Sequence, residues 1–433
     1  MMRAAAGIAG VLLLSACAYA PPPKPVSAAG AGSTVSPASV WRKVDAETGK
    51  IADLAGLQEL AEAFPDSSSV RLRLLRHHAG AKNIAGAVKE AMWLAERGYS
   101  FSDAARAQIL EMAGDTAIAA KLGSMLDRNS GPIAASSLAA TIPADALLVE
   151  GVAIDPQTGL LDATSVVSRK LHRQSADGSW GVKDLSRNGR LEPQSLSGIA
   201  FDPSGTHRWI AAGALGMTPK EGAYHVGAYH TERHAETTTI SRLRAPEDVN
   251  LSDVTVADSG TAYFSDPVGG GVYFAEPSYR YINTLIEPGQ FRSPQGLATS
   301  IDSSKLYISD YRYGIGVFDF QTMSVHRLSA QAPMILDGID GLWRYGNRLI
   351  AVQNGTNPMR IVSIELSPDG MSATNLTVLE QAHPAWTEPL GGSIHDGALY
   401  YVANGQWDRF GKGGALIPDK PPIPTQIRRL PLD

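Results

Sequence analysis

Six short phrases along the chain begin with residues whose chemistry could serve one site. Successive phrases start between 43 and 55 residues apart. Their first residues are Glu150, Ser197, Ser252, Gln295, Asp340 and Gly391. Two of these carry carboxylates and one carries a carboxamide, and hard cations such as Ca²⁺ and Mg²⁺ prefer oxygen donors of this kind. If the fold brings the first residues together, the sequence predicts a divalent-cation site.

The elements that must position these residues are short strands. Each phrase is a turn of small residues followed by a short apolar strand, as in residues 150–154. Further strands follow, in which aromatic or β-branched residues alternate with small ones. Repetition of such a unit every 40 to 50 residues or so is typical of a β-propeller with one four-stranded blade per repeat. The predicted fold is therefore mainly β, a six-bladed β-propeller over residues 145–433, and we expect residues 426–432 to complete the outer edge of the first or last blade.

Blade topology places the starts of the phrases at one mouth of the central channel. The innermost strand of each blade starts at one face of the ring, and the second strand returns to that face. The oxygen donors of Glu150, Gln295 and Asp340 are thus expected to converge near the axis. Two carboxylates at one mouth repel each other unless a cation neutralises them. Ca²⁺ is the preferred cation, with Mg²⁺ or Zn²⁺ as alternatives.

With these phrases, the chain resembles the gluconolactonase/regucalcin-like propellers (the senescence-marker-protein family), with wider similarity to paraoxonases and strictosidine synthase. The resemblance covers about residues 145–433, and the segments that carry it are 150–151, 253–266, 296–310, 338–342 and 352–355. Members typically bind one divalent cation through a blade-one glutamate, a blade-four asparagine and a blade-five aspartate. These positions fall on Glu150, Gln295 and Asp340, and a further family asparagine in blade three falls on Ser252. Gln295 is one methylene longer than asparagine and Ser252 is shorter, so the chain departs from the family at two of the four positions.

The resemblance implies hydrolysis of a lactone or another ester, with the cation polarising the carbonyl oxygen. Asp340 would be the catalytic residue that activates water as a general base. The predicted contacts to the small-molecule substrate are Ser252, Asn354, Arg360 and Asn404. The alternative is a non-catalytic propeller that docks envelope protein partners through the channel mouth and a helical region, which the departures at Gln295 and Ser252 favour.

The first residues predict export from the cytoplasm. Arg3 precedes an apolar run, residues 4–14, which is too short to span a bilayer comfortably and is typical of a signal sequence. The run leads into Leu-Ser-Ala-Cys ending at Cys17, which resembles the bacterial lipobox. Cleavage would remove residues 1–16 as a lipoprotein signal peptide, and acyl chains on Cys17 would then attach the chain to a membrane through the lipid alone.

The segment behind Cys17 predicts where the chain is held. Ala18 is not the aspartate that resembles an inner-membrane retention signal, which favours a periplasmic protein on the outer membrane. Residues 17–44 are rich in Pro, Ala, Gly and Ser and predict a flexible tether. The formal net charge is −5, without a Lys/Arg run, which argues against nucleic-acid binding.

Residues 45–128 are helical in pattern. Apolar residues recur at helical spacing, and Ser102 and Asp115 are expected to cap the fourth and fifth helices. Short helices with small residues on their contact faces resemble tetratricopeptide hairpins, of which about two repeats would be present. The sequence leaves two interpretations open for this small helical domain, which are a docking surface for a partner and a spacer packed on the propeller.

Overall fold

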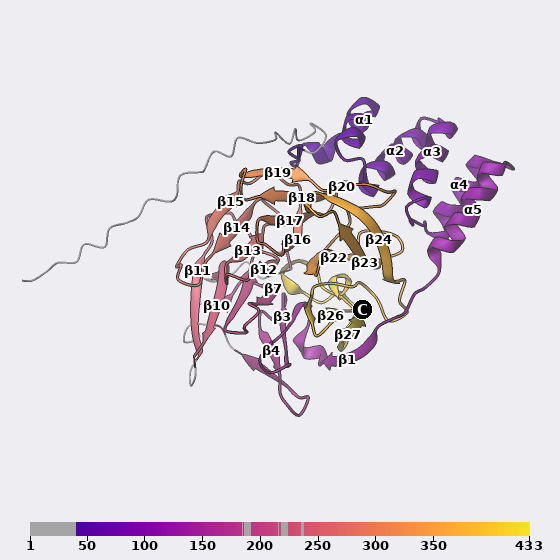
Figure 1. Cartoon of the computed structure of the whole chain (residues 1–433). Coiled ribbons are helices and arrows are strands. Elements are labelled where there is room, and N and C mark those ends of the chain that lie inside the picture. Colours follow the sequence, from indigo (N-terminus) through magenta and orange to yellow (C-terminus); the bar gives the residue numbers. More distant parts are fainter. Residues whose placement is uncertain (1–39, 184, 186–191, 215, 218–223, 235–237) are drawn as a thin grey trace, which may run out of the picture. The chain divides into compact units, whose positions relative to one another are not determined.

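The computed structural model describes residues 40–183, 185, 192–214, 216–217, 224–234 and 238–433. The predicted signal peptide, Cys17 and most of the predicted tether lie outside the described residues. The chain divides into the unit Met1–Ser36, which also lies outside them, and the unit Pro37–Asp433, which holds the helices and strands drawn in Figure 1. Within the described ranges, no helix has both the length and the apolar character that crossing a membrane requires.

The strands of the described residues form six antiparallel blades, as the repeat predicted. Blade one contains β2 (Val149–Ile154), β3 (Leu161–Ser165), β4 (Leu171–Gln174) and β5 (Trp180–Lys183). Blade two contains β7 (Leu196–Phe201), β8 (His207–Ala212), β10 (Gly227–Arg233) and β11 (Thr238–Arg244). Blade three contains β12 (Val254–Val256), β13 (Ala262–Ser265), β14 (Val272–Ala275) and β15 (Asn283–Ile286). Two short strands from the same stretch of chain, β6 (Glu192–Pro193) ahead of β7 and β9 (Tyr224–His225) between β8 and β10, form a separate parallel pair.

The remaining blades follow the same order from the innermost strand outwards. Blade four contains β16 (Pro294–Thr299), β17 (Lys305–Asp310), β18 (Gly314–Asp319) and β19 (Ser324–Arg327). Blade five contains β21 (Gly341–Tyr345), β22 (Arg348–Gln353), β23 (Arg360–Leu366) and β24 (Ser372–Gln381), with β20 (Ser329–Ala330) paired to β24. Each innermost strand contacts the innermost strand of the next blade, and β25 (Gly392–His395) contacts β2, so the ring closes.

Blade six shows how the ring is closed, and it differs from the prediction. Its strand order is β25, β26 (Ala398–Val402), β27 (Thr425–Pro431) and β1 (Ser137–Ile142). The expectation that residues 426–432 form an outer edge is wrong, because β27 lies between β26 and β1. The outer strand comes instead from residues 137–142, ahead of the predicted start of the propeller at 145. A strand from the beginning of the propeller thus completes its last blade and covers the edge of β27.

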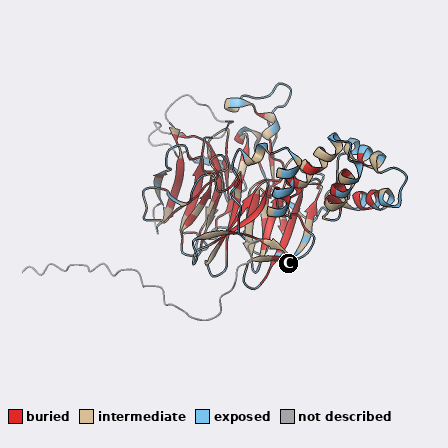
Figure 2. Ribbon diagram, turned by 90° about the horizontal axis from the view of Figure 1, so that it is seen from above, coloured by how far each residue is buried: buried red, intermediate tan, exposed pale blue. Residues whose placement is uncertain are grey.

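Five α-helices precede the propeller in the described part of the chain. They are α1 (Leu54–Ala63), α2 (Ser68–Gly80), α3 (Ile84–Ala95), α4 (Asp103–Ala113) and α5 (Ala117–Ser130). Ser102 caps α4 as predicted, because its hydroxyl accepts from the backbone N–H of Ala105. The cap of α5 is Thr116 and not Asp115, since the Thr116 hydroxyl accepts from Ala119 N. Figure 2 shows that burial is concentrated in the blades, while the helices keep exposed faces.

The first helices share a hydrophobic core with blades three and four. Trp41 is 3% exposed, and its ring lies 5.0 Å from that of Phe64 after α1 and 5.0 Å from that of Phe291 ahead of β16. Val44 is also fully buried in this cluster. The prediction of a flexible tether is therefore wrong at residues 40–44, because Trp41 and Val44 are buried against the apolar surface of this cluster.

Asp337, in the loop ahead of β21, caps α2 from the propeller. Its carboxylate accepts from the backbone N–H groups of Ser68 and Ser69, both at 2.8 Å, and from the Ser67 hydroxyl at 3.1 Å. Burial raises the pKa of Asp337 to about 6. Because the N-terminus of a helix has unpaired N–H donors, a carboxylate there ties α2 to blade five by hydrogen bonds as well as by packing. For α1 and α2, this favours the spacer interpretation of the helical region.

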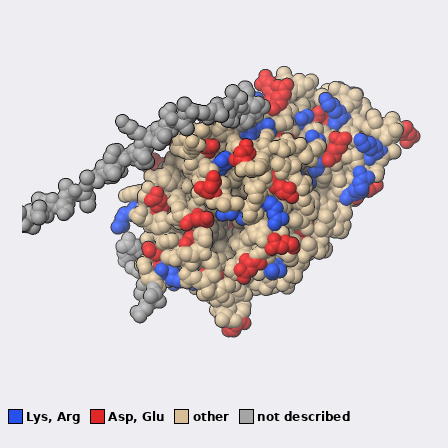
Figure 3. All heavy atoms as spheres, in the orientation of Figure 1, with Lys and Arg blue, Asp and Glu red and all other residues tan. Residues whose placement is uncertain are grey.

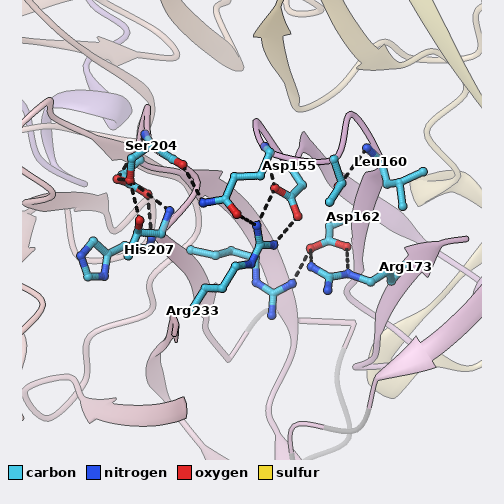
Figure 4. A network of polar contacts seen from close by, with 12 residues as sticks. Asp155, Leu160, Asp162, Arg173, Ser204, His207 and Arg233 are labelled. Atoms are coloured by element: carbon cyan, nitrogen blue, oxygen red, sulfur yellow. Dashed lines mark hydrogen bonds and ion pairs between the residues drawn. The ribbon is translucent and has the colours of Figure 1, made fainter. Parts of the chain in front are cut away.

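A polar network joins blade one to blade two (Figure 4). Asp162 on β3 is 1% exposed and accepts from Arg173 Nε at 2.7 Å and Nη2 at 2.8 Å. It also forms an ion pair with Arg208 on β8, whose guanidinium has its pKa lowered by burial. Arg233 on β10 bonds Asp155, which follows β2. Two carboxylates of one blade are thus held by two arginines of the next.

Candidate active site at the channel mouth

A small cavity of about 30 Å³ lies on the ring axis where the innermost strands begin. A cavity needs about 10–15 Å³ of such space to hold one water molecule, so this one has room for an ion or a water. Its polar lining residues are Glu150, Ser252, Asp253, Gln295 and Asp340. The strands approach each other closely here, since a Cβ atom on Gly198 would lie 2.7 Å from the Cα of Asp253. Glycine at this point of the phrase is what lets neighbouring blades meet around the axis.

Four carboxyl groups gather at this mouth and influence one another. Burial raises the pKa of Glu150 well above its usual value, and the charges of Asp340 and Glu388 raise it further. Burial also raises the pKa of Asp253 to about 7. For Asp340, burial, then Glu388, then Asp253 raise the pKa to about 7. Burial and then Asp408 raise the pKa of Glu388. Four acids that resist ionisation together form a site at which a cation would be stabilising.

Hydrogen bonds hold two of these carboxylates in fixed orientations. The indole N–H of Trp407 donates to Glu150 Oε2 at 3.0 Å. The Asn354 amide donates to Asp340 Oδ2 at 3.2 Å, and the Tyr311 hydroxyl donates to Asn354 Oδ1 at 2.9 Å. The Asn354 NH₂ group also donates to the carbonyl of Pro389 at 3.2 Å, and since both of its partners are acceptors, the amide nitrogen lies on the side of Asp340. The site therefore has a rigid polar support behind its carboxylates.

The structure brings together most of the residues that the sequence singled out. Glu150, Ser252, Gln295 and Asp340 line the axial cavity, and Asn354 contacts Asp340 directly. Gln295 Nε2 donates to Ser293 Oγ at 3.2 Å, which orients its amide group. On the face drawn in Figure 3, acidic and basic side chains of the described residues are interspersed around a hollow near the middle.

Two predicted substrate contacts, Arg360 and Asn404, have buried hydrogen-bond partners in the protein itself. Arg360 is 2% exposed, donates to Gln353 Oε1 at 2.7 Å and to the carbonyl of Arg97 at 3.2 Å, and so points toward the helices. Asn404 is 4% exposed and bonds the backbone of Pro424 and Gln426, which holds the start of β27. Both side chains are engaged in buried contacts between segments far apart in the sequence, and Asn404 also pairs through its backbone with Glu388.

Sequence reasoning missed two acids of the site, Asp253 and Glu388. A signal for Asp253 was present, because the second residue of the phrase is glycine in the other five blades, at Gly151, Gly198, Gly296, Gly341 and Gly392. The one blade that departs from glycine at this position therefore marks a residue that lines the axial cavity. Glu388 precedes the sixth phrase by three residues, and nothing in its surrounding sequence distinguishes it from a surface glutamate.

The donor set at the mouth fits a hard cation. In the part of the chain that the structure describes, no group of three or more His, Cys, Asp or Glu side chains is close enough to form a ready metal centre. The cavity nonetheless offers carboxylate and carboxamide oxygens, and neither sulfur nor imidazole lines it. Such a set suits Ca²⁺ or Mg²⁺ and not Zn²⁺, for which nitrogen or sulfur ligands are usual.

Comparison with known proteins finds similar solved structures but no matching family model and no matching curated protein. A gluconolactonase from Xanthomonas campestris is 17% identical, with 70% of this chain and 98% of that chain covered and a TM-score of 0.43. Regucalcin, a calcium-binding protein from Agrobacterium tumefaciens, is 15% identical, with 68% and 93% covered and a TM-score of 0.43. A virginiamycin B lyase from Staphylococcus aureus is 14% identical, with 66% and 80% covered and a TM-score of 0.42. The similar structures include gluconolactonase and regucalcin propellers, and they also include a lyase.

Proposed function

We propose that the chain is a divalent-cation-dependent hydrolase of a lactone or another ester, held in the bacterial envelope by a lipid on Cys17. The observation that carries the proposal is the convergence of Glu150, Asp253 and Asp340 on a cavity that has room for one ion. Isolated carboxylates at a propeller axis would be costly to bury, and a cation offsets that cost.

The residues of the site fall into two groups, those that would bind the cation and those that would transfer a proton. Glu150, Gln295 and Asp340 would hold the cation, and Asp253, which the resemblance did not supply, adds negative charge to the lining of the same cavity. When bound, the cation would polarise the carbonyl oxygen of the ester.

Asp340 would accept a proton from the attacking water as the water oxygen bonds to the carbonyl carbon. The bond between the acyl carbon and the ring or ester oxygen then breaks, and the proton passes to that oxygen, which yields a hydroxy acid or an acid and an alcohol. Without a cation, burial, Glu388 and Asp253 raise the pKa of Asp340 to about 7; a bound cation would lower that pKa, so Asp340 would be ionised and able to accept a proton at neutral pH. Asn354, fixed by Tyr311, would keep Asp340 oriented while the proton moves.

Location in the envelope is proposed from the sequence alone. The lipobox-like Leu-Ser-Ala-Cys and the residue Ala18 favour the periplasmic face of the outer membrane. Labelling of intact cells with a radioactive fatty acid would attach label to the wild-type chain and not to Cys17→Ala.

Removing the cation tests the function directly. We expect the full chain, stripped with a chelator, to lose lactone hydrolysis by about 10²-fold or more, because a Lewis acid supplies several kcal/mol to the transition state. Hydrolysis of aliphatic and sugar lactones would be followed by proton release, and Ca²⁺ or Mg²⁺ binding by calorimetry. Added Ca²⁺ should restore the rate in proportion to site occupancy. Undiminished turnover after chelation, or no turnover of any lactone by the Ca²⁺-loaded chain, would overturn the proposal.

A groove among the helices favours a second candidate function, the docking of an envelope protein. The groove has a volume of about 580 Å³. Its lining residues are Leu72, Leu75, Arg76, Ala79, Tyr99, Phe101, Ser102, Ala105, Gln108, Ile109, Met112 and Asn357. These are mostly apolar, with one exposed arginine and no acidic side chain, which suits an acidic segment with apolar anchors.

Crosslinking from the groove separates the two functions. We expect a photo-reactive residue at Gln108 to capture one defined envelope protein in cells, and the additional substitution Arg76→Glu to reduce that capture about tenfold by charge repulsion. The matched control places the same probe at Glu62 on α1, which lies outside the groove. No specific capture from Gln108, together with robust lactone turnover, would rule against the docking function.

A further inference from the structure

A second cavity lies on the ring axis, toward the ends of the innermost strands. Its volume is about 290 Å³, and all six blades contribute to it. The axial acids line the opposite stretch of the same strands, at the first two positions of each phrase. Apart from Ile199 and Gly392, which line both cavities, the larger cavity is lined by later positions of the chain in each blade, so it lies toward the other end of the channel.

Trp343 forms the floor of this cavity. It occupies the fourth position of its phrase, where four other blades carry small side chains, at Ala153, Ala200, Thr255 and Ala298. Its ring lies directly against Gly341, since a Cβ atom on that glycine would collide with the indole. Gly341 lines the acidic cavity and Trp343 lines the larger one. The indole ring therefore lies between the two cavities, and the small residues opposite leave space over it.

The walls of the cavity combine apolar side chains with both hydrogen-bond donors and hydrogen-bond acceptors. Arg344 donates through Nε to the carbonyl of Thr299 at 3.0 Å, and its Nη2 lies 4.0 Å from Asp258 Oδ1. His395 is partly buried and lies 3.3 Å from Asp396. Further hydroxyl groups and apolar side chains line the cavity at Ile154, Phe201, Thr255, Val256, Ser393 and Ile394.

We propose that this cavity is a second small-molecule site, which binds a single sugar residue over the face of Trp343. A pyranose ring pairs an apolar C–H face with a rim of hydroxyl groups, each of which can donate and accept. An aromatic floor complements the first feature, and Arg344, Asp258, Thr255 and Thr299 complement the second.

Size and charge restrict the ligand to this class. A volume near 290 Å³ is at the lower end of small-molecule pockets, which start at about 300 Å³, so it holds one ring and not an oligosaccharide. The one arginine has an aspartate beside it, which is poor complementarity for a phosphate or a carboxylate but suits a neutral polyol.

Sugar binding by the full chain tests the proposal. The probes are D-glucose, D-galactose and D-xylose, measured by saturation-transfer NMR and by tryptophan fluorescence. We expect binding of at least one probe with a Kd on the order of 1 mM. Trp343→Ala should weaken it about tenfold or more, because the stacking surface is lost. The matched control is Trp386→Phe, since Trp386 lies outside the cavity and its indole N–H donates to the Tyr401 hydroxyl.

Two further variants keep the result interpretable. Arg344→Gln should also weaken binding and covers the case in which Trp343→Ala does not fold, as judged by its unfolding midpoint. Glu150→Gln, at the other end of the channel, should leave sugar binding unchanged, and so should a chelator. Failure of all three sugars to bind, equal binding by wild type, Trp343→Ala and Arg344→Gln, or loss of binding in Glu150→Gln would each overturn the proposal. None of these outcomes depends on the lactone assay, so the two proposals can fail separately.

Discussion

Asp340→Asn is expected to lower lactone hydrolysis by about 10²- to 10⁴-fold, the range in which a general base contributes to catalysis. The carboxamide cannot accept the proton of the attacking water, and it removes one negative charge from the cation site. The fold should persist, because asparagine keeps an oxygen that can accept from the Asn354 amide, now 3.2 Å from Asp340 Oδ2.

The direction in which Asp340→Asn changes the unfolding temperature distinguishes a cation site from a purely structural role. Burial, Glu388 and Asp253 raise the pKa of Asp340 from 3.8 to about 7, so its ionisation costs folding free energy progressively as the pH rises from about 4 to about 7, and the full cost is present at pH 8. Without a cation, Asp340→Asn should therefore unfold at the same temperature as wild type or higher at pH 8. With Ca²⁺ present, wild type should gain stability and the variant should not.

Calorimetric Ca²⁺ titration, proton-release assays and thermal unfolding check this prediction together. The control is Asp115→Asn, an exposed aspartate ahead of α5 and far along the chain from the mouth residues, which should change none of the three. Wild-type turnover by Asp340→Asn would contradict the catalytic assignment, and an equal Ca²⁺-dependent stabilisation would contradict the cation site.

Asp162→Ala should lower the free energy of unfolding by about 3–5 kcal/mol, the usual cost of breaking a buried ion pair by removing one partner. Arg208 is 5% exposed and would keep its charge inside the protein without the carboxylate that now faces it. Arg173 would also lose two hydrogen bonds, although its side chain is 45% exposed and can turn to water. The loss falls between blades one and two, where the ring depends on side chains from adjacent sheets (Figure 4).

Unfolding in urea, followed by tryptophan fluorescence, measures the effect. The matched control is Asp177→Ala in the turn ahead of β5, an exposed aspartate whose partner Ser179 is two residues away. The double variant Asp162→Leu/Arg208→Met should recover much of the loss, because an apolar pair leaves no buried charge. A change below about 1 kcal/mol in Asp162→Ala would show that water reaches Arg208.

Much of the architecture could be predicted because it depends on local sequence patterns. The blade phrases, their glycines and the alternation of the following strands each involve residues only a few positions apart. Ser102 could be identified as a helix cap for the same reason, although Thr116 replaced Asp115 at the next helix. The outer strand β1 was missed, since a six-residue strand that pairs with β27 almost 300 residues later carries no signal of its own.

The site was predictable only in part. Glu150, Gln295 and Asp340 were found because they share a position in a repeat, and the axis of a propeller gathers equivalent positions. The partners of Arg360, which are Gln353 and the Arg97 carbonyl, could not be predicted, because they include a segment of the helical region far away in the sequence. Trp407 and Tyr311, which support Glu150 and Asn354, come from loops of other blades.

The sequence by itself determined a mainly β chain of six blades behind a helical region, and it determined that oxygen donors recur at one point of the repeat. Those features depend on strand period, glycine and spacing, which act over short stretches of chain. Only the tertiary structure decided that Asp253 and Glu388 join the axial acids and that Trp343 lies between two cavities. Ring closure is the physical reason, because it brings together side chains from different blades whose burial and charge then depend on one another.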